Sequence, residues 1–196
     1  GLLKKHIFLG ISLVDMYAKC GFLAKAHEVL KELPVRNEVS WSIVISRYAQ
    51  EWKGNEALNC YQEMERDGLS SDGITFIRVL QACGSVGAID RGSKIHDEIV
   101  DRGLLEQNTN LGNALVEKYV KCGLLAKALQ VVEELPNRDV VVSWSSLIAG
   151  YAQQGQGHAA LNCFEQMQME GISPNQVTVI GILNACSSKG ALGKGK

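Results

Sequence analysis

One block of this chain recurs at an offset of 102 to 103 residues, and this repetition restricts its possible folds more than any other feature. LVDMYAKCGFLAKAHEVLKELP at 13–34 corresponds to LVEKYVKCGLLAKALQVVEELP at 115–136, and ALNCYQEM at 57–64 returns as ALNCFEQM at 160–167. The offset is 102 residues for the first pair and 103 for the second, so one extra residue lies between Pro136 and Val142. Self-similarity at fixed spacing predicts stacked copies of one supersecondary unit.

Each block contains three shorter repeats. The repeats span 7–37, 38–72, 73–108, 109–140, 141–175 and a truncated 176–196, with lengths of 31, 35, 36, 32, 35 and 21 residues. Periods in this range are typical of a solenoid. We therefore expect residues 1–196 to form one array.

The hydrophobic period within the repeats is that of an α-helix. Trp41, Ile45 and Tyr48 lie at i, i+4 and i+7, which predicts the buried stripe of a first helix, and Ala57, Cys60, Tyr61 and Met64 predict the stripe of a second helix. Their counterparts in the second block repeat both patterns. Hydroxyl residues stand where first helices would need an N-cap, namely Ser40, Thr75, Ser143 and Thr178. We predict an all-α solenoid of antiparallel helical hairpins.

Composition limits the function. The chain is 46% hydrophobic and 21% charged with a formal net charge of -1, which is typical of a folded protein and unlike a strongly basic nucleic-acid binder. We expect no membrane span, because no apolar run approaches 18 residues. The 6 cysteines form no CxxC pair, so we expect small buried apolar side chains and neither a metal site nor a cofactor.

These residues resemble the pentatricopeptide repeat family, in particular its plant-type PLS subfamily, in which short, standard and long repeats alternate. LVDMYAKCG and LVEKYVKCG, followed by KELPVRN and EELPNRD, resemble the short repeat. VSWSIVISRYAQ and VSWSSLIAGYAQ begin segments that resemble the standard 35-residue repeat, and ITFIRVLQACGSVGAIDRGSKIHDEIV resembles the long repeat. GLLKKH at 1–6 looks like the tail of a preceding long repeat.

The resemblance implies a right-handed superhelix that binds single-stranded RNA, running 5′ to 3′ from the N to the C terminus, with one base read per repeat. In the family, the fifth and last residues of a repeat select the base. Ser42 with Asp72 then favours G, and Ser145 with Asn175 favours A. Asn113 with Asp139 favours U, unless Val140 occupies the last position, in which case the U assignment fails.

Other repeats depart from this pattern. Ile11 with Asn37, and Ile77 with Asn108, place an aliphatic side chain where a hydrogen-bonding one is expected, and Ile180 does the same. The implied target is 5′-N-G-N-U-A-N-3′. Apolar residues near the repeat starts are candidates for sandwiching the bases or for packing between hairpins, and they are Phe8, Val39, Ile74, Val142 and Val177, with Asn110 breaking the pattern.

Two lysines, Lys19 and Lys121, occupy equivalent places near the ends of first helices. A lysine there can meet a phosphate or simply remain solvated. The family also includes organellar RNA editing and processing factors, so we expect a mitochondrial or chloroplast location and other such factors as partners.

Two matches to enzyme motifs are incomplete. GALGKGK at 190–196 fits G-x-x-x-x-G-K but lacks the following Ser or Thr, and His96 with Glu98 forms H-x-E without the cysteine pair of a zinc deaminase. We therefore do not expect an enzyme. A protein-interaction scaffold like the tetratricopeptide repeats remains the alternative function.

Overall fold

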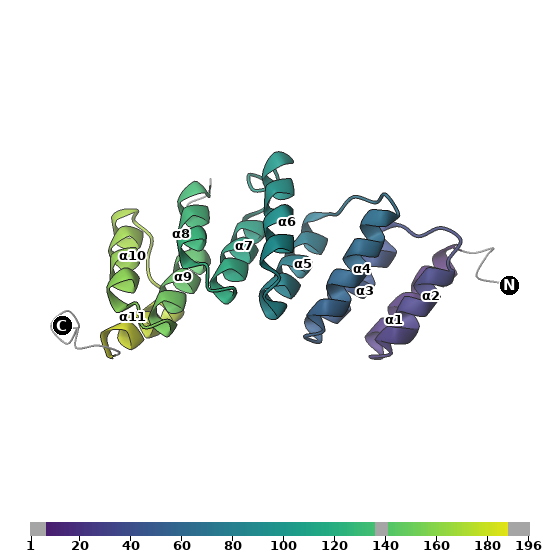
Figure 1. Cartoon of the computed structure of the whole chain (residues 1–196), viewed down its shortest axis with the longest axis horizontal. Helices are drawn as coiled ribbons and strands as arrows, with labels where there is room; N and C mark the ends of the chain where they lie inside the picture. Colours follow the sequence, from purple (N-terminus) through teal and green to yellow (C-terminus); the bar gives the residue numbers. More distant parts are fainter. Residues whose placement is uncertain (1–6, 136–140, 188–196) are drawn as a thin grey trace. The chain divides into compact units, whose positions relative to one another are not determined.

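The structure is a computed structural model that describes residues 7–135 and 141–187 (Figure 1). Over these ranges it contains eleven α-helices and no strand, which confirms the all-α prediction. The helices are α1 (Ile7–Lys19), α2 (Leu23–Glu32), α3 (Glu38–Gln50), α4 (Gly54–Arg66), α5 (Gly73–Val86), α6 (Ile89–Asp101), α7 (Thr109–Lys121), α8 (Leu125–Glu134), α9 (Val141–Gln153), α10 (Gly157–Met169) and α11 (Gln176–Ser187). Among the described helices, none has the length and apolar character needed to cross a membrane.

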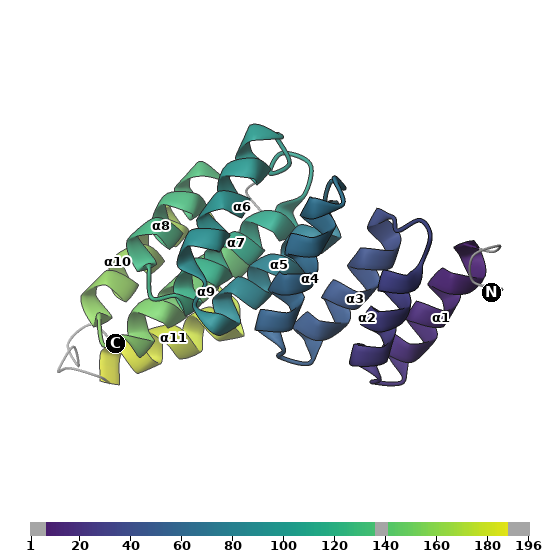
Figure 2. The ribbon, with the colours of Figure 1, turned by 45° about the vertical axis from the view of Figure 1, so that its right-hand side comes forward.

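The chain divides into two compact units, which we call unit 1, ending at Val86, and unit 2, beginning at Gly87. In unit 1, α3 packs against α1, α2, α4 and α5. In unit 2, α9 packs in the same way against α7, α8, α10 and α11 (Figure 2). The first helices of successive repeats therefore form a row within each unit, and the second helices pack against that row.

The predicted stripes form the core of each hairpin. Trp41 and Trp144 are 1% and 0% exposed, and Ile45 and Ile148 are fully buried beside them. On the second helices, Met64 and Met167 are also fully buried. The apolar residues at helical spacing thus hold each first helix against its second helix by removing large side chains from water.

The hydroxyl residues predicted as N-caps lie one turn further along, so that prediction is wrong in detail. Asn37 is the N-cap of α3, and its Oδ1 accepts from the backbone nitrogen of Ser40 over 2.9 Å. Ser40 Oγ in turn accepts from the backbone nitrogen of Asn37, which completes a capping box. The last residue of one repeat therefore starts the first helix of the next.

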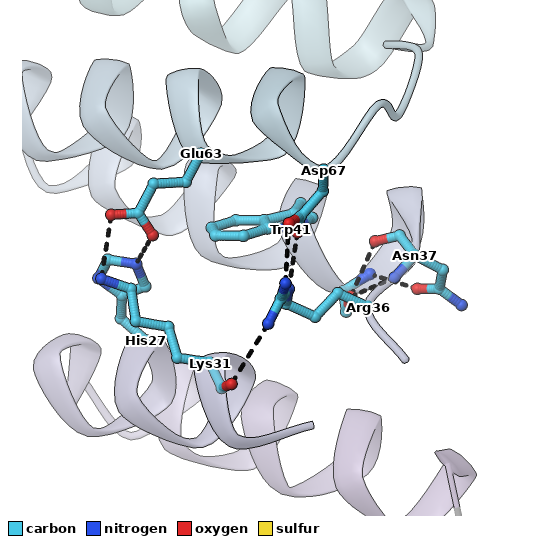
Figure 3. Close-up of polar contacts among 8 residues, drawn as sticks. His27, Lys31, Arg36, Asn37, Trp41, Glu63 and Asp67 are labelled. Carbon is cyan, nitrogen blue, oxygen red and sulfur yellow. Dashed lines mark hydrogen bonds and ion pairs between the residues drawn. The ribbon is translucent and has the colours of Figure 1, made fainter. Parts of the chain in front are cut away.

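Polar side chains link neighbouring hairpins in unit 1 (Figure 3). Asp67, just after α4, accepts from Arg36 Nε over 2.6 Å and from the indole nitrogen of Trp41 over 2.9 Å. Glu63 on α4 lies 3.2 Å from His27 Nε2 and 3.0 Å from Lys31 Nζ, both on α2. These contacts join α2 and the loop after it to the hairpin of α3 and α4.

The cysteines follow the sequence expectation only in part. Cys60, Cys83, Cys163 and Cys186 are buried, but Cys20 is exposed and Cys122 is half-buried. Burial raises the pKa of Cys60 to about 12 and that of Cys163 to about 11, so neither is a thiolate near neutral pH. Both are packing residues of second helices.

Candidate nucleic-acid interface

Three side chains converge where repeat 38–72 meets the next first helix. The carboxylate of Asp72 precedes α5 and accepts from the backbone nitrogen of Thr75 over 2.7 Å. The hydroxyl of Thr75 donates to Ser42 Oγ, 3.0 Å away on α3. Thr75 is 1% exposed, whereas Ser42 is half-buried and Asp72 is exposed. The two predicted base-reading residues are therefore joined through one buried threonine.

An open pocket of about 400 Å³ lies beside this junction. It is lined by Asp15, Glu38, Val39, Ser42, Ile43, Ser46, Arg47, Gln50 and Asp72. Three of these residues, Val39, Ser42 and Asp72, are ones that the sequence predicted to touch a base. The pocket is acidic overall, since three carboxylates face one guanidinium. It is suited to groups that donate hydrogen bonds.

The corresponding junction in unit 2 is more enclosed. Ser145 Oγ lies 3.1 Å from Asn175 Oδ1 and 2.7 Å from Thr178 Oγ1, and it also donates to the carbonyl oxygen of Val141 over 2.6 Å. Asn175 Oδ1 accepts from the backbone nitrogen of Thr178 over 2.9 Å. Ser145 is 2% exposed and Asn175 is half-buried. The predicted pair is thus brought together, with Asn175 the more accessible member.

Asn113 takes part in a third junction of this kind. Its Oδ1 accepts from Ser143 Oγ over 2.6 Å, and Ser143 is the third residue of α9. Asp139 and Val140, whose relative register decides the predicted U assignment, lie outside the described residues. The sequence predicts the third-position hydroxyls only as caps, whereas in the structure they also contact the fifth residue of the preceding repeat.

In the repeats that depart from the family pattern, the fifth residue makes no side-chain hydrogen bond to the following first helix within the described residues. Ile11 and Ile77 are half-buried, and Ile180 is 50% exposed. Asn37 caps α3, while Asn108 caps α7 by accepting from the backbone nitrogen of Asn110 over 3.1 Å. Both asparagines therefore have a structural role that is independent of any ligand.

The apolar residues near the repeat starts share one environment. Each is the second residue of a first helix, and each is exposed to a large degree: Phe8 86%, Val39 59%, Ile74 60%, Val142 54% and Val177 52%. These apolar side chains therefore recur at one repeat position with more than half of their surface accessible to a ligand.

The two lysines at the ends of first helices are engaged in local ion pairs. Lys19 Nζ lies 2.6 Å from Asp15, and Lys121 Nζ lies 2.7 Å from Glu117, each one turn earlier on its helix. Both pairs are solvent-accessible, and such pairs contribute only ~0.3–0.5 kcal/mol. A phosphate can therefore compete for either ammonium group at little cost.

The incomplete enzyme motifs gain no support. His96 Nδ1 lies 2.9 Å from the hydroxyl of Tyr119, and burial lowers the pKa of His96. Glu98 is paired with Arg102 over 3.2 Å. In the described part of the chain, no three His, Cys, Asp or Glu side chains are grouped so that they could hold a metal ion. The segment 190–196, which carries the G-x-x-x-x-G-K match, lies outside the described residues.

Comparison with solved structures gives the same fold. The pentatricopeptide repeat protein PPR10 in complex with an 18-nt psaJ RNA element superposes with a TM-score of 0.76 at 19% identity, covering 94% of this chain and 28% of that one. A nuclear proteinaceous RNase P 2 of Arabidopsis thaliana matches with a TM-score of 0.63 at 18% identity, over 81% of this chain and 37% of that one.

Proteins related in sequence share a higher identity with this chain than these two solved structures do. CRR2, a chloroplastic pentatricopeptide repeat-containing protein of Arabidopsis thaliana, is 42% identical over 98% of this chain and 29% of its own length. The mitochondrial protein At2g03880 of the same plant is 36% identical over 98% of this chain and 30% of its own length. This chain thus spans about a third or less of these relatives. Models of the PPR repeat family match residues 36–85 and 139–188, and models of the PPR repeat match 11–37 and 113–140. The chain belongs to the pentatricopeptide repeat family.

Proposed function

We propose that this chain binds single-stranded RNA selectively, with one nucleotide at each repeat. The family and the RNA complex of the structurally similar PPR10 support this function. The observation that carries it is the junction of Ser42, Asp72 and Thr75, where the two predicted base-reading residues line one open pocket beside the exposed Val39.

The chemistry of this pocket favours guanine. One carboxylate oxygen of Asp72 caps α5, and within the described residues the second oxygen accepts no hydrogen bond. A carboxylate only accepts hydrogen bonds, and guanine presents two adjacent donors on its Watson–Crick edge. Aliphatic contact from Val39 against the face of the base would complete the site.

The second standard repeat presents an amide instead. Asn175 Oδ1 is occupied by Thr178 and Ser145, which leaves the amide nitrogen to donate. A donor suits the N1 acceptor of adenine. Because Ser145 is buried, Asn175 makes the principal contact in our proposal, and Ser145 orients it. With Asn113 and Asp139 reading U, the proposed target is 5′-N-G-N-U-A-N-3′.

The proposed role is recognition rather than catalysis. We place the chain in the PLS subfamily, as the targeting part of an organellar RNA editing or processing factor. Its alternating repeat lengths and its chloroplastic and mitochondrial relatives support this assignment. Activity on the RNA would come from the remainder of a longer protein or from partner factors.

A binding assay with permuted single-stranded RNA tests the proposal. Ser42→Asn, with Asp72 kept, is expected to shift the preference at one position from G towards U and to leave the other positions unchanged. Ser46→Asn is the matched control, because Ser46 lines the same pocket but is not a predicted base reader. An unchanged profile for Ser42→Asn would refute the role of Ser42, and a chain that binds no RNA at low salt would instead support the protein-interaction scaffold.

A further inference from the structure

The pocket of repeat 38–72 extends along one face of α3, well past the residue proposed to read the base. The α3 residues that line it recur at helical spacing, from Val39 through Ser42 and Ser46 to Gln50. At 1.5 Å of rise per residue, Ser46 lies about 6 Å and Gln50 about 12 Å beyond Ser42 along the helix axis. The base-reading residues therefore occupy only one end of the pocket.

Asp15 brings the neighbouring helix α1 into the wall of this pocket. Asp15 is the ninth residue of α1, Ser46 is the ninth residue of α3, and the two first helices pack against each other in unit 1. Asp15 therefore lies at the level of Ser46, beyond the end that holds Ser42. The first helix of repeat 7–37 thus contributes a carboxylate to the pocket of the repeat that follows it.

One oxygen of the Asp15 carboxylate is available to a ligand. Its Oδ2 accepts from Lys19 Nζ over 2.6 Å, whereas Oδ1 accepts no hydrogen bond from any residue in the described ranges. Asp15 is half-buried, so it is partly shielded from water but still accessible. Because an ionised carboxylate only accepts hydrogen bonds, Oδ1 suits a ligand group that donates one.

The charges in the pocket orient a bound nucleotide. Among the described residues that line it, the single positive side chain is Arg47, one residue beyond Ser46. Phosphates are bound by cations, so a nucleotide whose base lies against Ser42 and Asp72 directs its backbone towards Arg47. Its ribose then lies between the two ends, at the level of Asp15.

A ribonucleotide offers one donor at this level. The phosphodiester and ring oxygens only accept hydrogen bonds, whereas the 2′-hydroxyl also donates and is absent from DNA. We propose that Asp15 Oδ1 accepts a hydrogen bond from the 2′-hydroxyl of the nucleotide read by repeat 38–72 and thereby selects RNA over DNA there. This inference rests on the proposed RNA binding. It also gives repeat 7–37 a contact with RNA despite Ile11.

Removal of the 2′-hydroxyl from a single nucleotide tests the contact. An RNA target with 2′-deoxyguanosine in place of its G should bind the unsubstituted chain about tenfold more weakly, as expected for loss of one hydrogen bond to a charged acceptor. 2′-Fluoroguanosine lacks the donor but keeps the ribose pucker, and it should cause a similar loss. For Asp15→Ala, both losses should largely disappear, because the acceptor is already absent.

Two controls isolate this effect. Glu38→Ala removes another carboxylate of the same pocket, from the first residue of α3, and should keep the full 2′-deoxyguanosine loss. A 2′-deoxyadenosine at the A of the target should weaken the unsubstituted chain and Asp15→Ala equally. Each comparison uses two oligonucleotides on one protein, so a general change in affinity when Lys19 loses its partner cancels.

The outcomes separate this inference from the proposed function. If the unsubstituted chain binds no RNA, both fail. If it binds the target but Asp15→Ala shows the same 2′-deoxyguanosine loss, or if the unsubstituted chain shows none, only the ribose contact is wrong. A changed base preference in Asp15→Ala would place Asp15 against the base and also overturn it. Circular dichroism checks that each variant keeps its helical fold.

Discussion

Thr75 Oγ1 donates a hydrogen bond to Ser42 Oγ over 3.0 Å, which couples the third residue of one first helix to the fifth residue of the preceding first helix. The same relation joins Ser143 to Asn113 and Thr178 to Ser145. The fifth residues Ser42, Asn113 and Ser145 are therefore each held by the repeat that follows. Changing a repeat should alter the site of its predecessor as well as its own.

Removal of these hydroxyls should cost stability to different degrees. Thr75→Val leaves Ser42 able to bond to water, since Ser42 is half-buried, and should lower the free energy of unfolding by about 1 kcal/mol. Thr178→Val removes the hydrogen bond to the hydroxyl of Ser145, which is 2% exposed. It also removes two contacts with Asn175, so a loss of about 2 kcal/mol is expected. Urea unfolding measures both, and equal losses would contradict the difference in burial.

Replacement of Asp72 by Asn should change selectivity while preserving the fold. Asn and Asp are comparable N-caps, so the hydrogen bond to the backbone of Thr75 should survive and stability should change little. The amide adds a donor and removes the charge, which should move the preference at that position from G towards A. Contacts to base edges discriminate by ~1–3 kcal/mol, so the shift should reach about tenfold in relative affinity. Competition binding with G and A oligonucleotides measures it, and Asn175→Asp should cause the opposite change at its own position.

Much of the fold could be predicted from the sequence because it depends on a repeated helical period. Trp41 and Trp144 carry that period, and both are buried as it requires. The sequence could not show that Ser145 is enclosed while Ser42 is accessible, because the two residues occupy identical repeat positions. Their exposure depends on the neighbouring side chains. Nor could sequence spacing show that Thr75 and Thr178 contact the preceding helix, which requires the packing of first helices side by side.

Trp52 adopts a backbone conformation that favours glycine. Its φ is 60°, whereas its counterpart Gly155 has a φ of 71° and no Cβ to strain. Trp52→Gly should therefore be more stable than Trp52→Ala by about 1 kcal/mol, since both remove the side chain and only Ala retains the strain. At Asn59, an exposed position within α4, the order should reverse, with Ala about 0.5–1 kcal/mol more stable than Gly. Urea midpoints of the four variants test the reversal, and the same order at both sites would refute it.

Thiol reactivity should follow burial. Cys20 is exposed, whereas Cys60 is 1% exposed with its pKa raised to about 12 by desolvation. In the folded chain at pH 8, iodoacetamide should modify Cys20 readily and leave Cys60 and Cys163 intact. Mass spectrometry of peptides identifies the labelled sites. Labelling in urea, where all six cysteines should react, is the control.

Protonation of Asp67 should make unit 1 less stable in acid. Hydrogen bonds from Arg36 are the main cause of its lowered pKa, with a further contribution from the indole of Trp41, while partial burial opposes them. A carboxyl whose pKa is lower in the folded than in the unfolded chain stabilises the fold above its unfolded pKa of ~3.9. That stability is lost as the pH falls through the folded pKa. We therefore expect the free energy of unfolding to fall below about pH 4.

Asp67→Asn separates this effect from general acid unfolding. The variant should be less stable than the unsubstituted chain at pH 7, because the amide cannot accept the paired hydrogen bonds of Arg36 as a charged partner. It should also lose less stability between pH 6 and pH 2, since one titrating group has been removed. Glu56→Gln, which removes an exposed carboxylate from the first turn of α4, serves as the comparison. Parallel stability curves for the Asp67→Asn variant and the unsubstituted chain would show that the Arg36 pair contributes nothing to the acid response.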